Sequence, residues 1–244
     1  MILPHPKDAI HKSWLYAILS AIADDAHLPF LLRFKGGTCA AMRGILPRFS
    51  VDLDFDLLYS RKVAFVQKRL VSIFIALGLK IKDQSRTAPQ FFLGYENAPG
   101  ERSTLKVDVT FPPNSEDEYE PVRFVDIDRI LHAHTIPTMF AHKLLATMGR
   151  FQKKGALAGR DLLDLYIFFR AGLPIQKEII EKQMNMAFED YLATLGAFVE
   201  KYFTQRVIDE DLNALMPPQA FSSVRRNLKS QVLVFLKDAA RHSG

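Results

Sequence analysis

Three aspartates alternate with apolar residues in one short segment, and their spacing suits metal chemistry. Asp52, Asp54 and Asp56 occupy every second position of the segment 51–57, which is the period of two expected of a half-buried strand. The three acids therefore share one face. Because same-face neighbours on a strand lie about 7 Å apart, Asp52 and Asp54 can both reach a pair of divalent cations, and carboxylate oxygen suits Mg²⁺. A solvent-facing acidic stripe on an edge strand would show the same pattern.

A glycine pair lies upstream of these acids. Gly36 and Gly37 follow an apolar segment that predicts a strand over 29–34, and Thr38 begins a helix-forming stretch through Met42. Glycines let the backbone come close to a ligand, and the free N–H groups at a helix start favour phosphate. The Thr38 hydroxyl would cap that helix or donate to a phosphate oxygen. A plain strand-to-helix turn also fits, but with the acids the pattern favours a nucleoside triphosphate site on Mg²⁺.

The two motifs together resemble a known family. The sequence K-G-G-T at 35–38 and R-F-S-V-D-L-D-F at 48–55 look like the nucleotidyltransferase superfamily of DNA polymerase β, and specifically its AbiEii/AbiGii-type abortive-infection toxins, which include bacterial toxins paired with an antitoxin. Arg48 and Ser50 precede the acidic strand closely enough to touch a bound triphosphate, although ordinary loop residues would stand there too. We assign nucleotide binding to Lys35, Gly36, Gly37, Thr38, Arg48 and Ser50.

A third carboxylate is implied by the resemblance. In the segment 105–111, Lys106, Asp108 and Thr110 alternate with apolar residues, so this segment predicts a strand on which Asp108 could lie beside Asp52 and Asp54. By resemblance, Asp108 would act on the attacking hydroxyl through metal or as a base. A polar residue on the open face of the sheet is the alternative.

A second block extends the resemblance. The sequence A-H-K-L-L-A-T-M-G-R at 141–150, followed by R-D-L-L-D-L-Y at 160–166, is similar to the part of the toxin family in which a helix lysine and an aspartate complete the active site. The resemblance implies that Lys143 holds triphosphate charge and that Asp161 orients the lysine or the acceptor. It leaves the role of Asp164 open. From the residues alone, Lys143 would be a solvent-exposed residue at the edge of the apolar face of its helix. Asp161 and Asp164 would lie in the first turn of the next helix, where negative charge interacts favourably with the helix dipole.

Composition narrows the class of protein. The chain has 244 residues, 48% hydrophobic and 24% charged, with a formal charge of +5, which suits a globular protein with a full core and permits a nucleic-acid partner. A single cysteine, Cys39, excludes an internal disulfide and favours a reducing cytoplasm. No stretch of about 18 apolar residues predicts a membrane span, and the N-terminus does not read as a secretory leader. We assign no metal to His132, His134 or His142.

Periodicity and turn residues place these motifs on elements. The expected fold is α+β: a nucleotidyltransferase domain with a mixed sheet over 1–130, then a helical domain over 131–244 that completes the active-site cleft. Asp8 would cap the first helix, an acidic run at 116–120 would be a solvated loop, and the sequence V-D-I-D at 125–128 would be ordinary surface. The expected helices cover 8–26, 61–79, 139–151, 160 onward, 175–186, 187–203 and 219–241, and the further strands cover 79–83, 90–95 and 104–111.

These observations predict an enzyme. Asp52 and Asp54 would hold two Mg²⁺ ions, and a nucleoside monophosphate would pass from a nucleoside triphosphate to an acceptor hydroxyl. By resemblance the acceptor is the 3′ end of a tRNA and the partner is a cognate antitoxin. A basic helix near the C-terminus favours RNA, although a soluble surface would look alike. The alternatives are nucleotidylation of a protein or of a small molecule such as an antibiotic, and a non-catalytic module that binds nucleotide or a partner.

Overall fold

The chain forms two compact units. The computed structural model describes residues 1–242, and these fall into a first unit, Met1–His134, and a second unit that begins at Thr135. The first unit carries the β-strands and the second is helical. An α+β architecture with a mixed sheet followed by helices confirms the predicted fold class.

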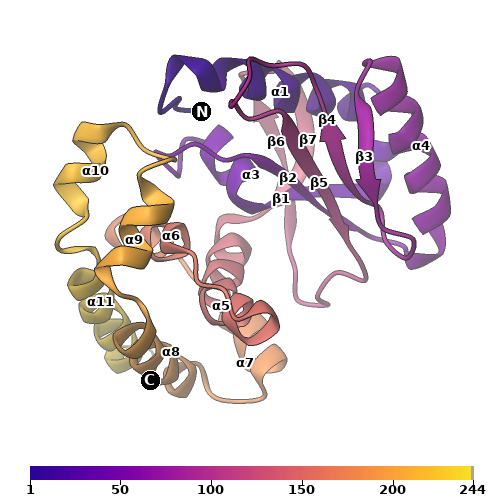
Figure 1. Ribbon diagram of the computed structural model, residues 1–244. Coiled ribbons are helices and arrows are strands. Elements are labelled where there is room, and N and C mark those ends of the chain that lie inside the picture. The colour runs from indigo at the N-terminus through magenta and orange to yellow at the C-terminus, as the bar shows by residue number, and fades with distance from the viewer. Residues whose placement is uncertain (243–244) are drawn as a thin grey trace. The chain divides into compact units, whose positions relative to one another are not determined.

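A mixed sheet runs through the first unit (Figure 1). In the described residues it has seven strands in the order β3-β4-β5-β2-β1-β7-β6. The central strand β2 is parallel to β5 on one side and antiparallel to β1 on the other. The strands are β1 (Leu32–Lys35), β2 (Asp52–Leu57), β3 (Lys80–Gln84), β4 (Gln90–Gly94), β5 (Thr104–Thr110), β6 (Tyr119–Phe124) and β7 (Arg129–His134).

Two amphipathic helices supply the core of this unit. Helix α1 (Ala9–Ala23) contacts β7 and α4 (Val63–Ala76), and α4 contacts β3. Ile18 of α1 and Phe74 of α4 are fully buried, and the ring of Phe74 meets that of Phe91 on β4 at 5.1 Å. Leu53 and Phe55 are also buried. Because side chains alternate along a strand, this packing leaves the three aspartates of β2 on the opposite face. The shorter helices are η1 (Pro6–Asp8), α2 (Leu28–Leu31), α3 (Gly36–Met42) and η2 (Ser60–Lys62).

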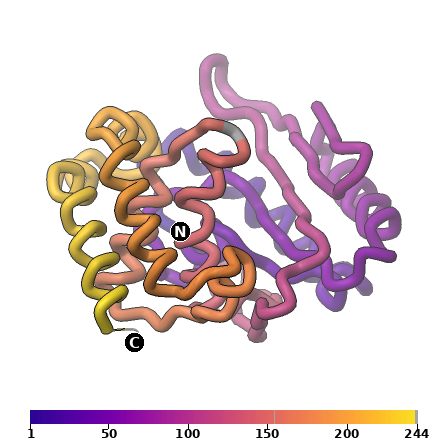
Figure 2. The backbone as a smooth tube through the Cα atoms, turned by 90° about the horizontal axis from the view of Figure 1, so that it is seen from below, coloured from indigo at the N-terminus to yellow at the C-terminus, as the bar shows by residue number. Residues whose placement is uncertain are grey.

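The second unit has a core of its own. Phe140, Leu162, Tyr191 and Leu236 come from four different helices and are all buried. Helices α8 and α11 lie side by side (Figure 2). No helix within residues 1–242 combines the length and the apolar character needed to cross a membrane. The helices are α5 (Ile136–Lys154), α6 (Gly159–Arg170), α7 (Lys177–Met184), α8 (Phe188–Tyr202), α9 (Gln205–Leu212), α10 (Pro218–Val224) and α11 (Leu228–His242).

The structure corrects three predictions near the N-terminus. The segment 29–34 is a turn of helix, α2, before it becomes β1. Pro29 lies in the first turn of α2, where its fixed φ is favourable, and the Asp25 carboxylate accepts hydrogen bonds from the N–H groups of His27 and Leu28. Asp8 stands at the start of α1 but its side chain caps no N–H group, and α1 ends at Ala23 rather than Ala26.

Sequence reasoning also missed the strands β6 and β7. The predicted strands end before this region, and the acidic run at 116–120 is predicted to be a solvated loop. In the structure Glu120 belongs to β6, and its carboxylate pairs with Arg43 at 2.7 Å. The β6 segment is polar and contains Pro121, which is tolerated because β6 is the last strand of the sheet and has a free edge. The V-D-I-D segment lies between the two strands as an exposed turn in which Val125 is 81% exposed, in agreement with a surface reading.

The C-terminal helices differ from the prediction in number. Helix α9 was not expected, and the single helix expected over 219–241 is divided into α10 and α11. The break follows Val224: the Gln205 side chain donates a hydrogen bond to the Arg225 carbonyl, and the Arg225 guanidinium pairs with Asp209 at 2.5 Å. A carbonyl engaged by a side chain is less available to the next helical turn, so these contacts from α9 stabilise the break.

Candidate active site

The acidic face of β2 gathers the carboxylates that sequence analysis selected. Asp52, Asp54 and Asp56 alternate with buried Leu53 and Phe55, as the period of two required. Strand β5 runs parallel to β2 in a register that pairs Asp54 with Asp108. Paired positions on neighbouring strands point to the same face of a sheet. The structure thus brings Asp52, Asp54 and Asp108 together on one face of the first unit.

Asp54 is the least compensated of these acids. Burial, and the like charges of Asp52 and Asp108, raise its pKa to about 6, against the opposing charges of Lys35 and Lys106. Within the described part of the chain its carboxylate accepts no hydrogen bond. Ionising several neighbouring carboxylates costs free energy because their charges repel, and a bound cation would offset that cost.

Asp108 is partly neutralised by the protein. Its carboxylate forms an ion pair with Lys106 on the same strand and accepts a hydrogen bond from the Gln90 side chain on β4 at 3.1 Å. Both Asp108 and Lys106 keep about a quarter of their side chains exposed, 26% and 25%. Ion pairs at this exposure are weak and exchange readily with solvent or ligand. Asp108 is therefore available to a ligand if Lys106 swings aside.

The glycine pair lets the backbone approach the acids closely. Gly36 has a φ of +80°, and a Cβ atom built on it would lie 2.3 Å from Oδ2 of Asp54. A Cβ on Gly37 would lie 2.8 Å from the Ser50 hydroxyl and 3.0 Å from the Arg48 guanidinium. A side chain at either position would have to displace its neighbours, and the first position also needs the left-handed backbone that glycine favours. Thus the start of α3 lies directly against Asp54.

Three residues assigned to nucleotide binding face the protein interior. The Thr38 side chain is fully buried, and its hydroxyl, which we expected to cap the helix or reach a phosphate, is 2.5 Å from the Asp52 carbonyl and 2.9 Å from the Ser50 hydroxyl. Arg48 and Ser50 are 2% and 8% exposed, so they are not ordinary loop residues. Arg48 donates to the Phe49 carbonyl at 3.0 Å. These three buried side chains therefore stabilise the glycine turn and the start of β2 from the protein interior.

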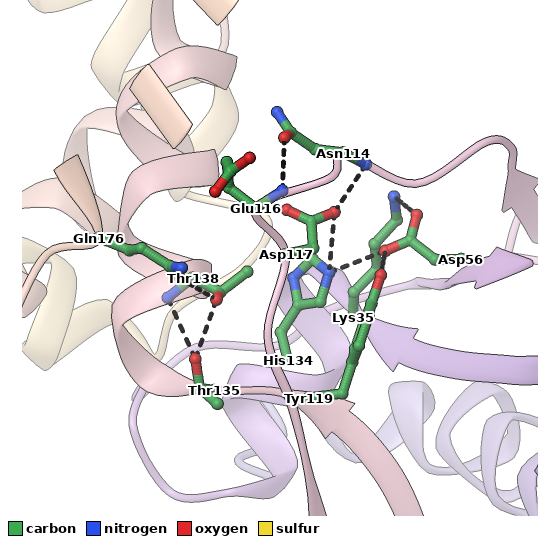
Figure 3. Close-up of polar contacts among 10 residues, drawn as sticks. All are labelled: Lys35, Asp56, Asn114, Glu116, Asp117, Tyr119, His134, Thr135, Thr138 and Gln176. Atoms are coloured by element: carbon green, nitrogen blue, oxygen red, sulfur yellow. Dashed lines mark hydrogen bonds and ion pairs between the residues drawn. The ribbon is translucent and has the colours of Figure 1, made fainter. Parts of the chain in front are cut away.

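Lys35 is held by a buried cluster that sequence analysis did not find. The Asp56 carboxylate, 1% exposed, accepts hydrogen bonds from Lys35 at 2.5 Å, His134 at 2.8 Å and Tyr119 at 3.2 Å (Figure 3). Burial opposes ionisation of Asp56, but the His134 hydrogen bond and the Lys35 charge outweigh it, so its pKa is lower than usual. The clue in the sequence was the third aspartate of the alternation. His134 and Tyr119 gave no signal, because they are far from Asp56 in the chain.

Two separate ion pairs link α5 to α6 in the second unit. Lys143 on α5 pairs at 2.7 Å with Asp164, whose side chain is fully buried, and Arg150 on α5 pairs at 3.1 Å with Asp161, whose side chain is 4% exposed. Asp164 rather than Asp161 therefore makes the contact with Lys143, and the alternative expectation, that Asp161 orients the acceptor, stays a prediction. Asp164 also lies beyond the first turn of α6, since that helix begins at Gly159. Helix-dipole stabilisation accounts for Asp161 but not for Asp164.

The C-terminal cations do not form one continuous stripe. The division into α10 and α11 separates them, and two are already paired: Arg225 with Asp209, and Lys229 with Glu200 at 3.7 Å. The basic residues near the C-terminus therefore support RNA binding less strongly than their sequence suggested.

One family model matches most of the chain. The family described as "Nucleotidyl transferase AbiEii toxin, Type IV TA system" matches residues 15–232, which confirms the resemblance seen in the motifs. No curated protein matches the chain. Two crystal structures from Helicobacter pylori share its fold: a candidate nucleotidyltransferase, with 20% identity, a TM-score of 0.55 and coverage of 97% of this chain and 94% of that one, and JHP933, with 19% identity, a TM-score of 0.55 and coverage of 99% and 97%.

Proposed function

Because the chain belongs to the AbiEii nucleotidyl transferase toxin family, we propose that it transfers a nucleoside monophosphate from a nucleoside triphosphate to the 3′ end of a tRNA, with release of pyrophosphate. The enzyme class, a nucleotidyltransferase, follows from the family; the acceptor, the metal and the residue roles are our proposal. The observation that carries it is the meeting of Asp52, Asp54 and Asp108 on adjoining strands with the glycine backbone against Asp54.

The donor set fits Mg²⁺. Carboxylate oxygens are the ligands that Mg²⁺ prefers, and the pKa of Asp54, raised to about 6 by burial and by its acidic neighbours, is typical of a site short of positive charge. We assign two ions to Asp52 and Asp54. Bound there, Mg²⁺ supplies the positive charge that offsets the triphosphate and lowers the pKa of the acceptor hydroxyl.

The other residues position the reactants. The backbone N–H groups at Gly36 and Gly37 donate hydrogen bonds to phosphate oxygens. Thr38, Arg48 and Ser50 hold that turn in place. Lys35, kept in position by Asp56, adds positive charge beside the triphosphate. Asp108 accepts the proton of the acceptor hydroxyl or orients it. In the second unit, the ion pairs Lys143–Asp164 and Arg150–Asp161 fix Lys143 and Asp161, the two side chains that the family resemblance assigns to catalysis.

The family also suggests a biological setting. A type IV toxin implies a cognate antitoxin, and transfer to the 3′ end of tRNA would arrest growth by blocking translation. A cytoplasmic location is part of this proposal, supported by one fully buried cysteine, Cys39, whose thiol pKa is raised by burial.

The test is a labelling reaction. Purified protein, Mg²⁺ and bulk tRNA are incubated with each α-labelled nucleoside triphosphate in turn. We expect one of the four to label tRNA, and we expect the double variant Asp52→Asn with Asp54→Asn to label it at least about 100-fold more slowly, since removing charge that stabilises a transition state costs this much. Growth arrest on expression should disappear in the same variant.

The remaining outcomes separate the alternatives. Label in protein or in a small molecule would replace tRNA as the acceptor. Nucleotide binding that needs no Mg²⁺ and releases no pyrophosphate would favour a non-catalytic module. Full activity and toxicity in the double variant would refute the assignment of Asp52 and Asp54.

A further inference from the structure

A cavity in the second unit includes Arg150 of the Arg150–Asp161 ion pair in its wall, and no ligand has been assigned to it so far. It measures about 370 Å³ and is lined by residues of α5, α7 and the start of α8. This volume lies in the range of cavities that hold small organic ligands. All of its lining residues fall between positions 142 and 191, so the cavity belongs to the second unit alone.

The charge of the lining is positive. Arg150 and Lys153 contribute to the wall, and none of the lining residues is acidic. Arg150 uses its Nε for Asp161 at 3.1 Å. Neither the remaining guanidinium nitrogens of Arg150 nor the Lys153 ammonium group makes a hydrogen bond or ion pair with other residues of the described chain. Unused donors on two cations one helical turn apart form a binding place for one or two anionic oxygens.

The rest of the lining is suited to a flat, partly apolar group. Met148 and Met184 supply flexible apolar surface, and Gln152 and Gln183 bring amide groups. The wall is anchored, because Tyr191 is fully buried and donates a hydrogen bond to the Leu144 carbonyl at 2.8 Å. Methionine surface adapts to planar groups, and amide side chains can pair with the edge of a base.

We propose that this cavity binds one nucleotide unit of the acceptor RNA. The phosphate contacts Arg150 and Lys153, and the base lies against Met148 and Met184. A free nucleoside triphosphate fits less well, because it binds as a complex with Mg²⁺ and the lining has no carboxylate to coordinate the ion. The inference rests on the proposed function for the identity of the ligand as acceptor RNA. It also explains Asp161, which holds Arg150 at the wall.

Binding can be tested apart from catalysis. Fluorescein-labelled bulk tRNA is titrated with the full-length protein at low salt, in EDTA and without nucleotide, and anisotropy gives Kd. Lys153→Glu changes an exposed side chain, so folding should be kept. We expect Kd for tRNA to rise about tenfold and the slope of log Kd against log salt to fall by about one. The matched control, Lys201→Glu, makes the same charge change on an exposed residue of α8 outside the cavity and should change Kd by less than about twofold.

Kinetics supply a second readout. In the labelling reaction, Lys153→Glu should raise KM for tRNA about tenfold and leave kcat and the KM for nucleoside triphosphate within about twofold. The proposal is overturned if Lys153→Glu binds tRNA as tightly as Lys201→Glu, or if only triphosphate binding is weakened. If the wild-type protein transfers nothing to tRNA but still loses tRNA affinity on Lys153→Glu, the cavity assignment stands and the proposed reaction fails.

Discussion

At the scale of single residues, the aspartates of β2 have opposite electrostatic settings. Asp54 accepts no hydrogen bond from the described residues and its pKa is raised to about 6, first by burial and then by Asp52 and Asp108. Asp56, two positions on, accepts three hydrogen bonds and its pKa is lowered. Hydrogen bonds and positive charge within the protein therefore stabilise the ionised form of Asp56, whereas they only partly offset the burial of Asp54.

The first prediction follows from this contrast. A raised pKa means that the folded state binds the Asp54 proton more tightly than the unfolded state, so this stabilisation is present at low pH and is lost as pH rises through about 6. We expect Asp54→Asn to raise the melting temperature without metal at pH 7.5 by about 2–4 °C, the change that 1 kcal/mol produces in a chain of this size. The gain should shrink towards pH 4, where wild-type Asp54 is protonated.

The control is the same substitution two residues away. Asp56→Asn removes an ionised carboxylate that binds Lys35, His134 and Tyr119, so it should lower the melting temperature at pH 7.5. Differential scanning calorimetry across pH measures both variants. A fall in melting temperature for Asp54→Asn at pH 7.5 would contradict the assignment of Asp54 as an uncompensated acid.

At the scale of elements, the site depends on how closely the start of α3 approaches β2. Gly36 needs a positive φ and also lies against Asp54, whereas Gly44 has a similar φ of +76° but open space, with no atom within 4 Å of the place that a Cβ would occupy. The two glycines thus separate the cost of backbone strain from the cost of steric exclusion.

We therefore predict different outcomes for the same change at the two positions. Gly44→Ala should cost only the strain of a left-handed backbone, about 1–2 kcal/mol in the free energy of unfolding. Gly36→Ala should cost more than this and reduce transfer at least about tenfold, because the added methyl group displaces Asp54 and a small misplacement has a large effect on rate. Urea denaturation and the labelling reaction measure the two quantities. Equal losses of unfolding free energy and of transfer rate at both positions would show that the contact between Gly36 and Asp54 is unimportant.

At the scale of the whole molecule, each unit has its own core. The first is built on a sheet packed against α1 and α4, and the second on aromatic contacts such as Phe140 with Phe168 at 5.0 Å and Phe151 with Phe198 at 5.4 Å. The units meet in sequence at Thr135, where the Thr135 hydroxyl caps α5 by accepting from the Thr138 N–H group. Our division into domains at 130/131 remains a proposal.

Independent cores lead to a prediction about fragments. Residues 135–244 expressed alone should fold into a helical unit with a cooperative thermal transition, because a buried core and its own helix caps do not require the sheet. Circular dichroism of the fragment measures this. A fragment without cooperative unfolding would show that the second unit depends on the first for stability.

Sequence alone determined the features that rest on local periodicity and on single residue types. The alternation in β2 set which face carries Asp52 and Asp54, and the glycine pair indicated a close backbone approach, because strand period and glycine conformation are local properties. The family motifs around these residues led to the enzyme class that the family match supports.

Only the tertiary structure decided the partners of those residues. His134 reaches Asp56 across 78 positions of the chain and Tyr119 does so across 63, and a polar edge strand such as β6 carries no alternation that would reveal it. Lys143 pairs with Asp164 and not with Asp161, because the choice depends on how α5 and α6 are rotated against each other. Such contacts are set by packing between distant segments, which residue spacing does not encode.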